Sequence, residues 1–282
     1  MSATFTLQEA ADELGVHYMT AYRYVRLGLL DAAKVGGAWQ VTSSALDDFR
    51  DGSAAGPVEA GSDAPWAARL EARLVDGDAH GAWGVVEAAM TSGADVRSVY
   101  LDMVGPAMMH IGARWAAGEF DVAVEHQATG IVMRIIGRLG SRCVRRGRSR
   151  GGLVIGAPIG ETHALPTAIL GDLMRLHGWD VTDLGANTPS ASFLHSAKRT
   201  PDLVAVGFSV THVDHLAAVH ECCSVIRQEL PEVRVVLGGH AIRSEEHARA
   251  LGADALAAGA DQLHELLVND VRSPVGGGVP DE

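Results

Sequence analysis

Cysteine is scarce in this chain. Three cysteines occur among 282 residues, and two of them, Cys222 and Cys223, are adjacent. That number and spacing support neither a disulfide framework nor a cysteine-ligated metal site. The chain starts without the basic residues and apolar core of a signal peptide, and no apolar run approaches the roughly 20 residues that span a bilayer. The expectation is a cytoplasmic protein that does not contact a membrane.

Aromatic residues and positive charge are also in short supply. Aromatics make up 5% of the chain, and 23 Lys and Arg face 35 Asp and Glu, for a net charge of −12. This charge argues against a general polyanion binder, so any contact with nucleic acid must come from a local basic surface. One dense basic run is interpreted as a solvated connector at a helix end, with a phosphate-binding patch as the alternative. It consists of Arg142, Arg145, Arg146, Arg148 and Arg150.

Composition divides the chain into five segments. The first has the residue pattern of a small folded domain. The second consists mainly of small and polar residues with Gly and Pro, which is typical of a flexible linker. The third has a helical pattern throughout, the fourth alternates apolar runs with helical patterns, and the fifth is predicted to be a disordered tail. The predicted boundaries are 1–50, 51–64, 65–146, 151–270 and 271–282.

The third segment predicts a four-helix bundle. Few β-branched runs occur in it, and Gly77, Gly93 and Gly118 interrupt the helical pattern. Glycine at such breaks ends a helix readily. The expected helices cover residues 65–76, 78–92, 95–116 and 121–145.

The fourth segment predicts a Rossmann-like domain. Its short apolar runs are separated by helix-length amphipathic segments, a pattern typical of βαβ units and a parallel sheet. The runs cover residues 153–158, 179–185, 203–209, 233–239 and 253–259. The expected fold class is therefore multidomain α and α/β, ending in a flavodoxin-type five-stranded parallel sheet that binds its ligand at the carboxyl ends of the strands.

The first segment has the rhythm of a helix-turn-helix. Thr6 and Glu9 have the spacing of a capping box, and Gly15 supplies a tight turn before a second helix over 18–27. The polar face of that helix and the hairpin after it, which turns at Gly36–Gly37, are the predicted DNA contacts. The DNA-binding candidates are Tyr22, Arg23, Arg26 and Lys34.

A helix-turn-helix followed by such a hairpin resembles the winged-helix domain of MerR-type and excisionase-type regulators. An interaction module without DNA affinity is the alternative, because residues 1–50 carry four Lys and Arg against six Asp and Glu. Phosphate neutralisation supplies most of the affinity for DNA, so one copy would bind weakly. The hypothesis of operator binding therefore includes a homo-oligomer.

The turn after the first Rossmann strand contains Glu161, Thr162 and His163. A histidine at that place points into the ligand crevice, and a neutral imidazole is a natural ligand for cobalt. Glu161 is close enough in sequence to accept the other ring N–H, which would set the tautomer. One histidine among 13 is a weak signal by itself.

Small residues lie at the carboxyl ends of the third and fourth strands of the predicted sheet. Ser209 ends the third strand, Thr211 lies two residues further on, and Gly238 and Gly239 end the fourth. With His163, these positions and their spacing resemble the cobalamin-binding domains of methionine synthases and mutases, whose signature is Asp-x-His-x-x-Gly, Ser-x-Leu and Gly-Gly. The resemblance implies that His163 replaces the dimethylbenzimidazole base below cobalt, and that the base lies beside the later motifs.

Three positions depart from that signature: Glu161 stands for Asp, Pro166 for Gly and Thr211 for Leu. Glutamate in the first position is similar to the photoreceptor branch of the superfamily. A Rossmann-like domain with ordinary glycine turns is the alternative interpretation, because a fold alone never establishes a function.

The bundle carries an independent motif. Trp115 ends one predicted helix, and Glu125 and His126 open the next after nine intervening residues, which include Val122. An indole can pack on a sugar or apolar group, and a carboxylate can bind ribose hydroxyls; a core tryptophan and a helix-start charge are the alternatives. The motif and the order of the three domains resemble the light-sensing, adenosylcobalamin-dependent MerR-type repressors of the CarH kind. That resemblance implies a cap over the adenosyl group.

One position differs from those photoreceptors. A histidine directly after the tryptophan ligates cobalt there after illumination, whereas this chain has Ala116. His110 and His126 are the candidate substitutes. The related photocobilins pair cobalamin with a bilin, so a second chromophore stays open.

The leading hypothesis is a light-responsive, cobalamin-dependent transcriptional regulator without catalytic residues. The state of the upper ligand would control its oligomerisation and DNA binding. A cobalamin carrier or corrinoid methyltransferase subunit is the second hypothesis, and a regulator that has lost its cofactor is the third.

Overall fold

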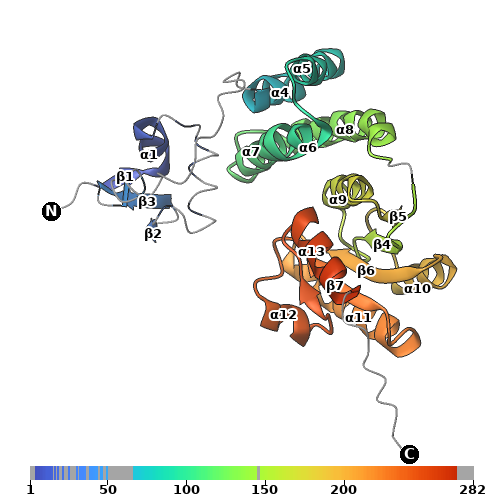
Figure 1. Cartoon of the computed structure of the whole chain (residues 1–282). Coiled ribbons are helices and arrows are strands. Elements are labelled where there is room, and N and C mark those ends of the chain that lie inside the picture. The colour runs from blue at the N-terminus through green and yellow to red at the C-terminus, as the bar shows by residue number, and fades with distance from the viewer. Residues whose placement is uncertain are drawn as a thin grey trace, which may run out of the picture.

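The computed structural model describes three parts of the chain. Residues 66–144 and 147–271 are described continuously. The preceding part is described only at 4–14, 16, 18, 21, 25, 30, 32–35, 38–43, 45, 46 and 49. The three parts are an N-terminal α/β unit, a helical bundle and a parallel sheet with helices on both faces (Figure 1). The predicted fold class is confirmed.

The N-terminal unit contains one described helix and a small antiparallel sheet. The capping box is present: the side chain of Thr6 accepts from the Glu9 N–H, and Glu9 accepts from the Thr6 N–H, at the start of α1 (Leu7–Glu13). Strands β2 (Ala33–Val35) and β3 (Ala38–Thr42) form the predicted hairpin. The sequence did not reveal β1 (Thr4–Thr6), which pairs with β3. The second helix as a unit and the 51–64 linker lie outside the described residues.

The bundle is formed by the expected segments, with two differences. Its helices are α4 (Trp66–Val75), α5 (Ala79–Thr91), α6 (Val96–Ser98), α7 (Gly105–Ala116) and α8 (Val122–Leu139). Gly77, Gly93 and Gly118 have positive φ, which lets the chain leave each helix without the cost of a Cβ. The helix expected over 95–116 instead contains a π-helical stretch, Val99–Val104. The helix expected to reach residue 145 ends at Leu139, where a 3₁₀ turn (Gly140–Arg142) follows.

The sheet has five parallel strands, as predicted. They are β4 (Gly152–Gly156), β5 (Asp180–Asp183), β6 (Leu203–Ser209), β7 (Arg234–Gly238) and β8 (Ala255–Leu256), in the order β5-β4-β6-β7-β8. The order reverses between β4 and β6, and the carboxyl ends there are the place where doubly wound sheets bind ligands.

Five helices cover the sheet. Alternate strand residues point to opposite faces, so Leu153 joins the apolar cluster of one face and Val154 that of the other. The first cluster includes residues of α9 (Leu165–Leu176) and α13 (Ala260–Val271). The second includes residues of α10 (Ser190–Arg199), α11 (Leu216–Glu229) and α12 (Glu245–Ala250). Because Val271 is helical, α13 extends into the predicted tail; residues 272–282 lie outside the described residues.

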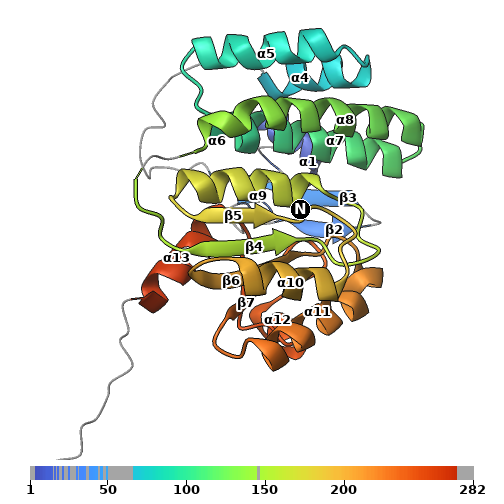
Figure 2. The same ribbon diagram turned by 90° about the vertical axis from the view of Figure 1, so that its right-hand side faces the viewer.

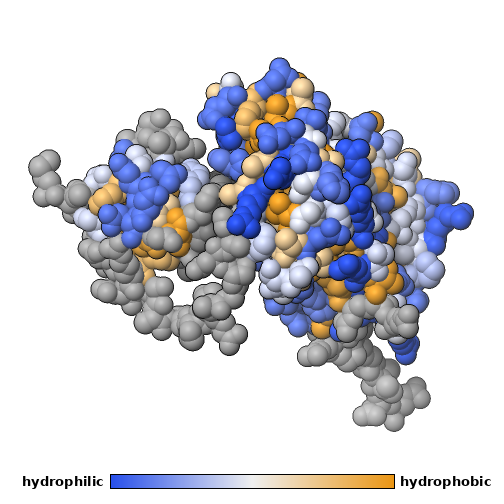
Figure 3. Space-filling view, turned by 90° about the horizontal axis from the view of Figure 1, so that it is seen from above, coloured by the Kyte–Doolittle hydropathy of each residue, from blue (hydrophilic) through white to orange (hydrophobic). Residues whose placement is uncertain are grey.

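The bundle packs on the α9 side of the sheet (Figure 2). Its buried side chains belong to the same apolar cluster as Leu173 and Met174 of α9, so one core runs through bundle and sheet. Figure 3 shows hydrophobic residues interspersed with hydrophilic ones on the face seen from above. Among the described residues, no helix combines the length and the apolar character needed to cross a bilayer.

Candidate functional site

Glu161 is the structural centre of the loop between β4 and α9. Its side chain is 1% exposed and accepts four hydrogen bonds. Nδ1 of His163 lies 2.5 Å from Oε1, and the backbone N–H of His163 also donates to Oε1. The backbone N–H groups of Thr211 and His212 donate to Oε2 at 2.7 and 3.1 Å. One buried carboxylate therefore joins the loops that follow β4 and β6.

These hydrogen bonds decide the charge of Glu161. Burial by itself raises the pKa of the carboxyl, but the bonds from His163, Thr211 and His212 outweigh it and hold the pKa below its usual value. In the neutral form of the His163 ring, an ionised Glu161 favours the tautomer with the proton on Nδ1, which leaves the lone pair on Nε2. The His163 side chain is 53% exposed, so Nε2 is available to a ligand.

Asn187, which the sequence did not single out, holds the same loop from the β5–α10 connection. Its side-chain oxygen accepts from the Gly160 N–H at 2.8 Å, and its own N–H donates to the Glu161 carbonyl at 2.7 Å. Both Gly160 and Asn187 have positive φ, a conformation that asparagine tolerates better than most residues. In the sequence, Asn187 could have been noticed only as a polar residue of a type common in turns.

Ser209 and Gly238 are directly paired across β6 and β7, as the sequence motif required for a common site. Gly239 has a φ of +94°, and an added Cβ would overlap the backbone carbonyl of Val210. At Gly238 an added Cβ would lie 2.9 Å from the Ala257 carbonyl oxygen. Both glycines are therefore needed for the close approach of three strand ends, and Ser209 is buried beside them.

Both polar and apolar side chains are exposed at the carboxyl ends of the strands. Thr162 is exposed next to His163. Ile159 and Val213, in the loops after β4 and β6, are about half exposed and were not predicted as site residues. Exposed apolar side chains at this edge of the sheet can cover apolar parts of a bound organic ligand. The only feature of the sequence that could have indicated these two residues was their position just after predicted strands.

The bundle presents its predicted motif at the α7–α8 turn. Trp115 is 46% exposed in the last turn of α7, and Val122, the first residue of α8, is also exposed. Glu125 accepts from the Thr129 hydroxyl at 2.8 Å, while the neighbouring His126 is 74% exposed. This turn lies at the same side of the molecule as the carboxyl ends of the strands (Figure 2). No hydrogen bond joins the two groups among the residues that the structure describes.

His110 and His126, the two histidines considered as alternative ligands above cobalt, differ in their surroundings. Nδ1 of His110 lies 2.6 Å from a carboxylate oxygen of Glu71 on α4, and Arg114 binds the other oxygen. His126 has a carboxylate oxygen of Glu125 3.7 Å away, beyond hydrogen-bond distance. His126 is thus the less engaged imidazole of the two.

The DNA-binding candidates are largely outside the described residues. Tyr22, Arg23 and Arg26 belong to that group, and of Lys34 only the backbone, in β2, is described.

The donor set fits a corrinoid better than a bare metal ion. Within the described ranges, no group of three His, Cys, Asp or Glu side chains could hold a metal. A macrocycle that already supplies its equatorial ligands needs one axial donor, and the exposed His163 imidazole with Glu161 behind it could supply one.

Comparison with known families supports the same cofactor. Residues 66–139 and 151–267 match two families that are each described as a B12 binding domain, and residues 4–53 match a family described as a helix-turn-helix domain. The chain is 23% identical over 202 residues to a corrinoid protein of Desulfitobacterium hafniense (strain Y51), covering 70% of this chain and 93% of that one.

Among solved structures, the monomethylamine corrinoid protein of Methanosarcina barkeri superposes with a TM-score of 0.63 and 16% identity. The match covers 71% of this chain and 96% of that one, and at this identity it shows the fold. Together, the family matches support a cobalamin or corrinoid cofactor and a helix-turn-helix at the N-terminal end of the chain.

Proposed function

We propose that this chain is a cobalamin-dependent transcriptional regulator, in which the upper ligand of the corrinoid controls oligomerisation and DNA binding. One observation carries the proposal: the exposed, Glu161-supported imidazole of His163 lies in a chain that also matches a helix-turn-helix domain. A carrier needs the first feature, and the second favours a regulator because helix-turn-helix domains commonly bind DNA.

The roles of the residues follow from their positions. His163 supplies the lower axial nitrogen, and Glu161 positions it and holds its proton on Nδ1. Ser209, Gly238 and Gly239 line the path of the nucleotide base beside Thr162 and Thr211. Trp115, Val122, Glu125 and His126 cover the upper face, for which adenosylcobalamin is the favoured form. Tyr22, Arg23, Arg26 and Lys34 are the DNA contacts of this proposal.

Regulation requires two arrangements of the bundle that differ by a few kcal/mol. A bulky upper ligand would favour the arrangement in which Trp115 packs against it. Light would act by removing that ligand. Since Ala116 cannot ligate cobalt, the light state would use His126 or no protein ligand above cobalt, and a bilin as second chromophore fits the same scheme.

A corrinoid carrier or methyltransferase subunit is the second candidate. It is favoured by the likeness to proteins named corrinoid proteins, which extends over the bundle and the sheet. In that role His163 and Glu161 would tune methyl transfer, and the N-terminal unit would have another partner.

The test is reconstitution of the full chain with adenosylcobalamin in the dark, followed by illumination and size-exclusion chromatography. We expect a bound cobalamin spectrum that changes with light, together with a change in elution volume. A selection of duplexes from a random DNA pool with the same protein should enrich one motif in one light state. Cobalamin binding without enrichment in either state would favour the carrier, and absence of corrinoid binding would refute both candidates.

A further inference from the structure

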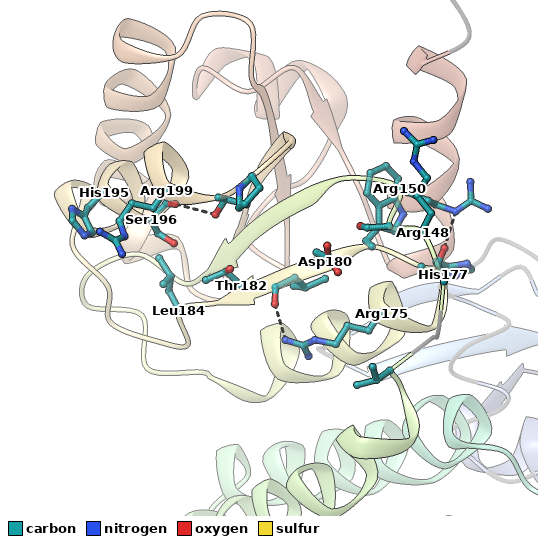
Figure 4. A pocket seen from close by; sticks show the side chains of 18 of the residues that line it. Arg148, Arg150, Arg175, His177, Asp180, Thr182, Leu184, His195, Ser196 and Arg199 are labelled. Carbon is teal, nitrogen blue, oxygen red and sulfur yellow. Dashed lines mark hydrogen bonds between the residues drawn. The ribbon is translucent and has the colours of Figure 1, made fainter.

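A large hollow lies along the outer edge of β5, and none of the proposed cobalamin contacts lines it (Figure 4). Its volume is about 1200 Å³, and its walls come from residues 144 and 147–150, the end of α9 with the turn after it, the β5 strand, α10 and the start of the next connection. Pockets for small organic ligands usually measure about 300–1,000 Å³. The hollow, called the β5 groove below, is slightly larger than that range and therefore has room for a small organic ligand.

The β5 groove is strongly cationic. Its charged or titratable lining consists of Arg148, Arg150, Arg175, Arg199, His177, His195 and Asp180. Figure 4 shows Arg148, Arg150 and His177 at one end, with His195 and Arg199 at the other. In a chain with a net charge of −12, four arginines around one hollow are a local reversal of the charge. Arg148 and Arg150 belong to the basic run for which a phosphate-binding patch was the alternative interpretation.

Two of the arginines are held in place by hydrogen bonds. Arg150 donates from Nε to the His177 carbonyl at 2.9 Å, which leaves its terminal nitrogens for a ligand. Arg175 donates to Asp172 and to the Val181 carbonyl, both at 2.9 Å, and is neutralised there. Arg148, Arg150 and Arg199 form no ion pair with any residue that the structure describes. Within the described part of the chain, these three arginines therefore lack a paired counter-charge.

The edge of the sheet is poorly suited to pairing with another strand. Arg175 occupies the outward Val181 carbonyl, so an added strand would lose a hydrogen-bond acceptor. A second copy of β5 in antiparallel pairing would bring Asp180 near the partner's acidic end as well, because the strand begins and ends with aspartate. The groove thus favours a small anion over an extended peptide or a second sheet.

We propose that the β5 groove binds a small phosphate compound of nucleotide size that carries several negative charges. Guanidinium groups bind phosphate oxygens in pairs and with good geometry, and the preorganised Arg150 needs little ordering to do so. Arg148 and Arg150 bind one charged group, and Arg199 with His195 binds a second at the other end of the groove. The site is independent of the corrinoid.

The test is calorimetric titration of the full chain with ATP and with inorganic triphosphate, each at low salt. Arg150→Gln and Arg199→Gln should each weaken binding about tenfold or more, because each removes a charge-assisted hydrogen bond. Arg134→Gln is the matched control: it removes the same charge from an exposed position of α8 outside the groove, and should leave affinity within about twofold.

Circular dichroism establishes that each variant is folded, and adenosylcobalamin binding should be equal in all of them. The proposal is overturned if neither probe binds at millimolar concentration. It is overturned also if Arg134→Gln weakens binding as much as the groove variants, because the effect would then be one of net charge. Binding of duplex DNA through Arg150 and Arg199, with neither probe bound, would replace it by a nucleic-acid contact.

Discussion

The hydroxyl of Tyr100, in the bundle, donates a hydrogen bond of 2.6 Å to the carboxylate of Asp172, in helix α9 of the Rossmann-like domain. Both side chains are buried. Burial, and after it the bond to Asp172, raises the pKa of Tyr100 far above its usual value, so the phenol stays neutral. Arg175 balances the charge of Asp172 from the other side. This bond ties the bundle to the sheet at the π-helical stretch, a kind of distortion frequently found at functional sites.

Tyr100→Phe should lower the free energy of unfolding by about 1–3 kcal/mol, because it removes a buried hydrogen bond to a charged acceptor. Urea unfolding followed by circular dichroism measures the change. Ser224→Ala is the control, since that exposed hydroxyl bonds only to the His220 carbonyl and should contribute less than about 0.5 kcal/mol. Equal stabilities of Tyr100→Phe and the unmodified chain would show that the bond does not stabilise the interface.

His163→Ala should abolish the spectral signature of histidine ligation and weaken corrinoid retention. Glu161→Gln should keep that signature and weaken retention about 10- to 100-fold, the usual effect of removing a partner behind a ligating histidine. Equilibrium dialysis and absorbance spectra measure both effects. His195→Ala, on α10, serves as control for the loss of a histidine. An unchanged spectrum in His163→Ala would refute the assigned lower ligand.

Trp115→Ala should weaken binding of adenosylcobalamin more than binding of hydroxocobalamin. The indole is half exposed at the end of α7, where only a bulky upper group can cover it. Parallel titrations with the two cobalamins give the ratio of affinities. Trp83→Ala, on α5 of the same bundle, should leave that ratio unchanged. Equal losses for both cobalamins in Trp115→Ala would argue against an adenosyl cap.

Gly239→Ala should destabilise the protein by about 2 kcal/mol or more. The positive φ disfavours a side chain there, and the new Cβ would overlap the Val210 carbonyl, which accepts from Ala241. Gly259→Ala is the matched control, because nothing lies within 4 Å of an added Cβ and its φ is not positive. Thermal unfolding of the two variants gives the comparison. Similar midpoints would mean that the strand ends move apart at little cost.

The stability of the fold should fall below neutral pH partly through His264. Burial, and then the charges of His177 and Arg150, lowers the pKa of His264 below its unfolded value of 6.5. The folded state therefore binds fewer protons, so this stabilisation is complete above pH 6.5 and is lost as pH falls through the lower folded pKa. Its Nδ1 accepts from the Trp179 indole, and a second proton would break that bond.

Unfolding free energies at about pH 7.5 and 5.5 test this expectation. The loss over that interval should be smaller in His264→Gln than in the unmodified chain. His240→Gln, a change at an exposed histidine, controls for general effects of pH. Equal losses in His264→Gln and the unmodified chain would exclude a contribution from His264.

Local chemistry made much of this molecule readable from its sequence. The capping box of Thr6 and Glu9, the glycines that end the bundle helices, and the alternation of strands and helices all depend on residues close in the chain. The pairing of His163 with Glu161 was predictable for the same reason, since only one residue separates them within one turn. Hydrogen bonds and backbone preferences between residues close in the chain can be predicted from the local sequence.

Only the tertiary structure decided the contacts between distant segments. Glu161 accepts from the N–H groups of Thr211 and His212, about 50 residues away, and Tyr100 meets Asp172 across 72 residues. The cationic β5 groove likewise arises because packing brings residues 147–150 and α10 to one edge of the sheet. No local pattern predicts these contacts, because they depend on how whole elements pack. The sequence by itself determined most of the elements and the side chains that they carry, but not the pairing of β1 or the π-helical stretch.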